Sequence, residues 1–109
     1  MTTYYKAVRP DGTDFRTGKV DYLAGGVISH PNPGKEGGSD AAGYLSVSAS
    51  VTDCTGFSWP ARLLEVDPVG VVWEPDAVRL PSKRAVKALR VVRELDASLL
   101  FGPQGKEIV

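Results

Sequence analysis

Residues 44–50, YLSVSAS, show the clearest alternation of apolar and polar positions in the chain. Leu45, Val47 and Ala49 fall on one side of an extended strand, while the tyrosine and the serines fall on the other. The pattern predicts a half-buried strand whose second face carries hydroxyl groups.

Shorter apolar runs predict further strands, separated by turn residues. Pro10, Asp11 and Gly12 form a turn signal, and Pro68 is expected to interrupt a later extended run. The other predicted strands are residues 3–9, 13–15, 27–29, 61–66, 70–74 and 88–95. The expected core consists of Val8, Leu45, Val47, Leu63, Leu64, Val66, Val71, Leu89, Val91 and Leu95.

Three segments have the pattern of short helices. Ser50 stands three residues before Asp53, which is the spacing of a capping box, and predicts a helix over residues 51–55. Ser82 has the character of an N-cap and predicts a helix over residues 82–87. Residues 96–101 predict one more helical turn.

Residues 88–95, ALRVVREL, fit two periodicities. At helical spacing Leu89 and Val92 share a side with Arg93, which interrupts the apolar stripe, whereas at strand spacing Leu89 and Val91 share a face. The strand interpretation is favoured. The fold class that follows is α+β: a small, mostly antiparallel sheet of about five strands with two or three short helices.

The length of 109 residues predicts a single domain over residues 1–109. Residues 30–43, HPNPGKEGGSDAAG, contain two prolines, four glycines and almost no large apolar side chain, so we expect a flexible loop. Such a loop is either a lid over a ligand or loose chain. The tail from residue 103 is expected to be frayed.

Composition narrows the possible functions. Thirteen basic residues balance thirteen acidic residues, and this zero net charge argues against a general nucleic-acid binder. No stretch approaches the ~20 apolar residues of a membrane span, and the N-terminus has no signal-peptide pattern. Cys54 is the sole cysteine, which excludes an internal disulfide and favours a cytoplasmic location.

Candidate chemistry is sparse. His30 and Cys54 each lack an evident catalytic or metal-binding partner, so no metal site is expected. The glycines of the 30–43 loop match neither the dinucleotide-binding nor the P-loop pattern, and no cofactor is expected. The hydroxyl face of residues 44–50 and the basic stripe at residues 79–93 suit a phosphate-bearing small molecule. The candidate ligand-binding residues are Tyr44, Ser46, Ser48 and Arg90.

Three stretches resemble an uncharacterised family of small proteins from bacteriophages and actinobacteria. They are GYLSVSASVTD at residues 43–53, EVDPVG at residues 65–70 and RVVREL at residues 90–95. The resemblance implies a phage or prophage origin, with the host cytoplasm as the location if the protein is phage-encoded, and it implies no particular activity. A phage-type accessory protein that binds a host protein or a small ligand without catalysis is the function expected on these grounds.

The chain is also remotely similar to ADP-ribosyltransferase-type domains. The resemblance rests on Arg9 in the first strand, on GYLSVS at residues 43–48 and on Glu94 in a late strand. It implies that Arg9 holds a diphosphate, that Ser46 braces the nicotinamide half of NAD and that Glu94 stabilises an oxocarbenium-like centre. An NAD-binding domain, active or degenerate, is therefore an alternative function.

A third possibility is a structural or self-assembling protein. Exposed strand edges such as residues 4–9 can pair between copies of a chain. The non-enzymatic binder is favoured over both alternatives, because no catalytic constellation stands out in the sequence.

Overall fold

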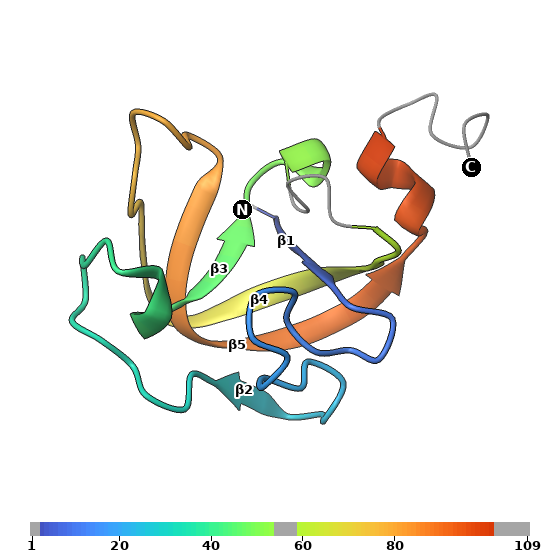
Figure 1. The fold of residues 1–109 in the computed structure, drawn as a ribbon, viewed down its shortest axis with the longest axis horizontal. Coiled ribbons are helices and arrows are strands. Elements are labelled where there is room, and N and C mark those ends of the chain that lie inside the picture. Colours follow the sequence, from blue (N-terminus) through green and yellow to red (C-terminus); the bar gives the residue numbers. More distant parts are fainter. Residues whose placement is uncertain (1–2, 54–58, 102–109) are drawn as a thin grey trace.

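The computed structural model describes residues 3–53 and 59–101. Its strands and 3₁₀ turns follow one another along the chain as shown in Figure 1. The strands are β1 (Tyr4–Val8), β2 (Val27–Ser29), β3 (Leu45–Ser48), β4 (Arg62–Trp73) and β5 (Lys83–Leu95). The 3₁₀ turns are η1 (Ala41–Gly43), η2 (Val51–Asp53) and η3 (Ala97–Phe101).

The fold is mainly β, and the expected α+β class is wrong, since the described residues contain 3₁₀ turns but no α-helix. The helix expected at residues 82–87 is absent because β5 begins at Lys83 and pairs there with β3. This pairing buries Ala85 and Val86 completely. Burying these side chains between two strands stabilises the fold by more than a helix cap would, because a cap contributes only about 1 kcal/mol.

The other two expected helices are single turns. Residues 51–53 form η2, while residues 54 and 55 of the expected helix lie outside the described part of the chain. The helical turn expected near residue 96 is confirmed by η3, where the Asp96 carboxylate accepts the Ser98 backbone N–H at 2.9 Å.

Four strands close into a ring. The order along the sheet is β2-β5-β3-β1-β4, and β4 also pairs with β5, so β1, β4, β5 and β3 form a circuit. All pairings are antiparallel, and β2 lies beyond β3 along the same edge of β5. β1 lies between β3 and β4, but β4 pairs with it from Tyr4 to Val8 whereas β3 pairs with it only at Tyr5. The self-assembly hypothesis, which depends on an exposed strand edge such as residues 4–9, stays a prediction.

The strands β4 and β5 form one long hairpin. Pro68 was expected to end an extended run, but it lies inside β4 opposite Leu89. The ladder between β1 and β4 reaches only to Val66, so the missing N–H of Pro68 interrupts no pairing with β1. Register shifts in the hairpin bend its strands, and this bending allows the ring to close.

One of these shifts corrects the expected core. The register slips between Val69 and Val72, and Val71 is 52% exposed although the sequence placed it in the core. Val72 is partly buried against the core instead. Such an irregularity reverses the side-chain alternation, which apolar periodicity cannot reveal.

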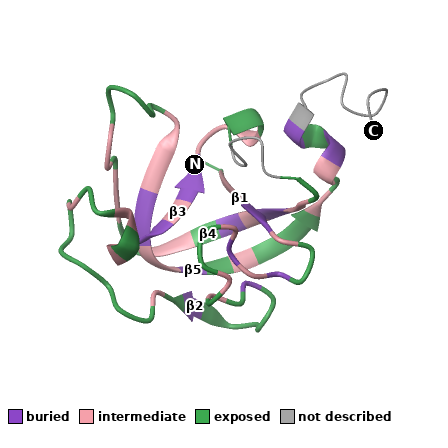
Figure 2. Ribbon diagram, in the orientation of Figure 1, coloured by how far each residue is buried: buried purple, intermediate pink, exposed green. Residues whose placement is uncertain are grey.

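The main core is built by all five strands (Figure 2). It comprises Val8, Tyr22, Ile28, Leu45, Val47, Leu64, Val66, Val86 and Leu89. Most of the expected core is confirmed, while Val91 is only partly buried. Tyr22, from the connection between β1 and β2, is a large side chain that the periodicity did not assign to the core.

A second cluster lies on the opposite face of β1 and β4. Its buried members are Ala7, Leu63 and Leu100, and the partly buried Leu95 packs against them. Neighbouring residues in a strand point to opposite faces, so a strand buried at consecutive positions needs cover on both sides. The turn η3 supplies that cover through Leu100.

The 30–43 loop is fastened at several points. The Gly34 N–H donates to the Gly43 carbonyl at 2.8 Å, and the Trp73 indole N–H donates to the Gly38 carbonyl at 2.9 Å. These contacts hold the two ends of the loop together beside β3. The expected flexibility of the loop stays a prediction.

None of the helical segments in the described part of the chain is long and apolar enough to cross a lipid bilayer.

Candidate anion-binding pocket

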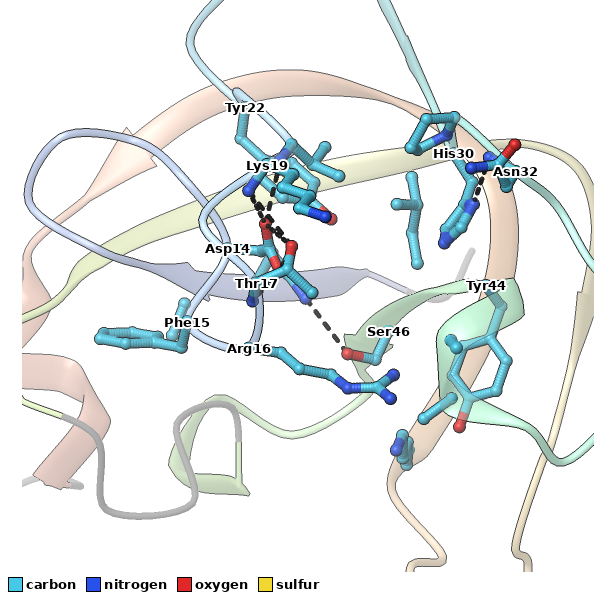
Figure 3. Close-up of a pocket in the computed structure, with 18 residues that line it drawn as sticks. Asp14, Phe15, Arg16, Thr17, Lys19, Tyr22, His30, Asn32, Tyr44 and Ser46 are labelled. Carbon is cyan, nitrogen blue, oxygen red and sulfur yellow. Dashed lines mark hydrogen bonds between the residues drawn. The ribbon is translucent and has the colours of Figure 1, made fainter.

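A cavity of about 380 Å³ lies beside β1 and β3 (Figure 3). Its walls come from these two strands, from the 14–22 loop and from both ends of the 30–43 loop, with Lys83 of β5 at one side. Small-ligand sites span roughly 300–1,000 Å³. The cavity is therefore large enough for a small organic ligand.

The cavity exists because β1 and β3 diverge. Their ladder consists of one residue pair, Tyr5 with Ser48. Beyond that pair β1 continues along β4 and β3 continues along β5, so the two strands separate. The Lys6 ammonium group spans the resulting gap and donates to the Ser46 hydroxyl at 3.1 Å.

The 14–22 loop is organised by one buried carboxylate. Asp14 accepts the backbone N–H groups of Thr17, Lys19 and Val20 at 2.8, 3.1 and 3.0 Å, together with the Thr17 hydroxyl. Burial by itself would raise the pKa of Asp14, but the N–H groups of Val20 and Thr17 outweigh burial and hold this pKa below its usual range. Asp14 is therefore a charged structural centre of the loop.

Arg9 fastens the same loop from β1. One Nη atom of its guanidinium donates to the Phe15 carbonyl at 2.9 Å. Gly18 has φ +69°, and a Cβ at this position would lie 2.7 Å from Arg9 Nη1. The backbone conformation favours glycine there, and a Cβ would also displace the end of the Arg9 side chain. Together these contacts place the loop over the cavity.

Positive charge collects in the cavity. The basic side chains that line it are Lys6, Arg16, Lys19 and Lys83. Within the described residues, Arg16, Lys19 and Lys83 take part in no ion pair. Among the lining residues that the structure describes, Asp14 is the only one with a carboxylate, and its oxygens accept hydrogen bonds from the loop. A bound anion would offset the excess positive charge.

Aromatic rings support two of these cations. The Lys83 ammonium lies 5.3 Å from the centre of the Tyr44 ring, and the Lys6 ammonium lies at the same distance from the Tyr22 ring. Tyr44 also packs edge-on against Trp73. Burial raises the pKa of Tyr22, so its phenol stays neutral. Figure 3 shows the Arg16 side chain reaching toward Ser46 and Tyr44.

His30 lies at the cavity wall. Its Nδ1 accepts the Asn32 backbone N–H at 3.0 Å, so the neutral ring carries its proton on Nε2. Within the described residues no group of three His, Cys, Asp or Glu side chains gathers to hold a metal ion. Cys54 lies outside the described part of the chain.

The structure divides the four expected ligand-binding residues into two pairs. Tyr44 and Ser46 line the cavity. Ser48 does not line the cavity, and its hydroxyl donates to the Ser50 carbonyl at 2.7 Å and accepts the Ser50 N–H. Arg90 is exposed on β5, in register with Val27 of β2, and does not line the cavity.

The three candidate catalytic residues do not meet. Arg9 holds the 14–22 loop, and Ser46 lies opposite Ala85 near the start of β5. Glu94 lies near the other end of β5, where it forms an ion pair with Arg62 at 3.0 Å. Nine residues of strand separate Ala85 from Glu94, about 30 Å at the usual rise per residue.

The sequence analysis missed the cationic lining. Lys6 lies within the predicted first strand, Arg16 and Lys19 flank a Thr-Gly turn, and Lys83 lies in a segment expected to be helical. The one local signal is the run TDFRTGK at residues 13–19, in which an acidic side chain precedes two basic ones. Only the fold shows that the basic side chains converge.

Gly43 fixes the end of the 30–43 loop that borders the cavity. A Cβ on Gly43 would lie 2.9 Å from the Gly34 Cα, so Gly43→Ala must displace backbone. We expect the Gly34 amide to exchange with solvent about tenfold faster, a loss of roughly 1.4 kcal/mol of local stability. Hydrogen exchange measured by NMR tests this. Ser39→Ala, at an exposed position of the same loop, is the control, and unchanged Gly34 exchange in Gly43→Ala would contradict the prediction.

Comparison with known proteins gives no matching family model, no matching curated protein and no matching solved structure. The geometry of the pocket is therefore the basis for assigning a function to the chain.

Proposed function

We propose that this protein is a non-enzymatic binder of a small anionic ligand, held in the cavity between β1 and β3. The observation that carries the proposal concerns the described lining of the cavity: it holds four basic side chains and one carboxylate, and that carboxylate is already hydrogen-bonded. Arginine, lysine, hydroxyl and imidazole groups are the usual partners of phosphate and carboxylate oxygens. This is the ligand-binding form of the accessory role that the sequence led us to expect.

The two alternative functions receive less support. The separation of Ser46 from Glu94 leaves no common site for NAD chemistry of the expected kind. Pairing with β4 from Tyr4 to Val8 occupies one edge of β1, which leaves less of that strand available to join copies of the chain.

Arg16 and Lys83 provide the test of the anion site. Pyrophosphate and inorganic phosphate are suitable probes, with binding measured by calorimetry and by thermal stabilisation. We expect Arg16→Gln and Lys83→Gln each to weaken pyrophosphate binding about tenfold, because a hydrogen bond to a charged group contributes roughly 1.5–3 kcal/mol. Affinity should also fall as salt rises.

The matched control is Arg90→Gln, which removes the same charge from an exposed position away from the cavity. It should leave the affinity nearly unchanged. An equal loss of affinity in Arg90→Gln would show that binding depends on the overall charge of the protein and not on the cavity. Failure of both probes to bind would exclude a phosphate-type ligand, and the proposed function as a whole fails if carboxylate ligands do not bind either.

A further inference from the structure

The ladder between β1 and β3 stops at the edge of the cavity. The Ala49 N–H donates to the Ser82 carbonyl at 2.8 Å, so the peptide groups of Ala49 point toward the chain of β5. Peptide groups alternate in direction along a strand, and those of Ser48 and Ser46 therefore point toward β1. Ser48 finds Tyr5 there.

The next pair of this ladder is not formed. Antiparallel continuation from Tyr5 and Ser48 would set Ala7 opposite Ser46, but the ladder contains no such pair. Both residues line the cavity instead. The main chains of β1 and β3 thus present two facing edges across the gap, and backbone polar groups of this kind require hydrogen-bond partners.

Basic side chains border the same gap between β1 and β3. The basic groups of Arg16 and Lys83 border the same gap, and Figure 3 shows Arg16 directed toward Ser46. A strand edge supplies main-chain donors and acceptors, while the surrounding cations favour carboxylates. A ligand that bonds to the strand edges and also to the cations has an extended peptide backbone and acidic side chains.

We propose that the anionic ligand is a short acidic peptide in extended conformation, inserted between β1 and β3. Its main chain pairs with the peptide groups of Ala7 and Ser46 and so completes the interrupted sheet. Its carboxylates meet Arg16, Lys19 and Lys83. This inference depends on the proposed anion site, and it adds that the ligand is recognised through its backbone as well as its charge.

The experiment uses a blocked five-residue peptide that alternates glutamate and valine. Binding is measured by calorimetry, and NMR follows the amide signals of Ala7 and Ser46. We expect the peptide to bind, to shift these two signals and to slow their hydrogen exchange. A peptide with glutamine in place of glutamate should bind at least roughly tenfold more weakly, because it loses its ionic hydrogen bonds.

Backbone methylation separates the two parts of the proposal. A peptide N-methylated at its central residue keeps every carboxylate but loses a main-chain donor, and it should bind at least roughly tenfold more weakly. Methylation at the first residue, outside the predicted pairing, is the control and should change little. Equal affinity of the centrally methylated peptide would overturn backbone pairing and leave the anion site intact.

Two further outcomes bear on the ligand class. If pyrophosphate or a nucleoside monophosphate binds and the acidic peptide does not, the peptide proposal fails while the proposed function stands. If the peptide binds without shifting the Ala7 and Ser46 signals, it occupies another surface and the proposal fails as well. Failure of every anion would overturn the proposed function itself.

Discussion

Leu89→Ala is expected to lower the free energy of unfolding by about 3 kcal/mol, within the usual range for a buried leucine. Leu89 is completely buried in the main core. It lies in register with Ile28 of β2 on one side and with Pro68 of β4 on the other. Truncation would leave a cavity where three strands meet, and β4 cannot move inward to fill it without disturbing the ring.

Leu80→Ala is the matched control, because Leu80 is 47% exposed in the turn between β4 and β5. It should change stability by less than about 0.5 kcal/mol, as is usual for surface substitutions. Urea unfolding followed by circular dichroism measures both variants. Equal losses in the two variants would contradict the placement of the core.

Asp14→Ala is expected to cost about 3 kcal/mol, nearly as much as the core truncation, although the side chain is polar. The substitution leaves the N–H groups of Thr17, Lys19 and Val20 without their shared acceptor. Hydrogen bonds to a charged group contribute roughly 1.5–3 kcal/mol each, and hydration of the opened loop offsets part of their combined loss. Denaturant unfolding measures the cost.

The stabilisation by the Asp14 carboxylate should depend on pH. The pKa of Asp14 is lowered in the folded protein, so the stabilisation is complete above the ordinary carboxyl pKa. As the pH falls below that value, the unfolded chain takes up a proton first, and stability declines until the pH has passed the folded pKa. Unfolding experiments between neutral and acidic pH should therefore show a weaker decline in Asp14→Ala than in the unmodified protein.

Asp11→Ala is the control for this effect. The Thr13 hydroxyl and the Thr13 N–H lower the pKa of Asp11 as well, but its carboxylate is fully exposed and water can replace those partners. We expect little change in stability at any pH. A loss as large as that of Asp14→Ala would contradict the special role of the buried carboxylate.

Asp14→Ala also tests the pocket. The loop that Asp14 organises carries Arg16 and Lys19, so anion binding should weaken although no cation has been removed. Asp14→Asn keeps one acceptor oxygen of the same shape and should lie between the two proteins in stability and affinity. Unchanged affinity in Asp14→Ala would show that the loop does not position the basic side chains.

The sequence by itself determined the extended segments whose apolar pattern is regular. The strand at residues 45–48 and its buried positions Leu45 and Val47 follow from alternation alone. Alternation is a local property, set by the geometry of a single strand. Tyr44 and Ser46 belong to the pocket for the same reason, since their face of the strand was predictable.

Only the tertiary structure decided the rest. Residues 83–87 became part of β5, where pairing with β3 buries Ala85 and Val86, and Val71 became exposed because a register shift reverses the alternation. The basic residues of the pocket lie far apart in the sequence and meet where β1 and β3 diverge. Closure of the ring sets that point of divergence, and closure depends on pairing between distant strands, which no local pattern encodes.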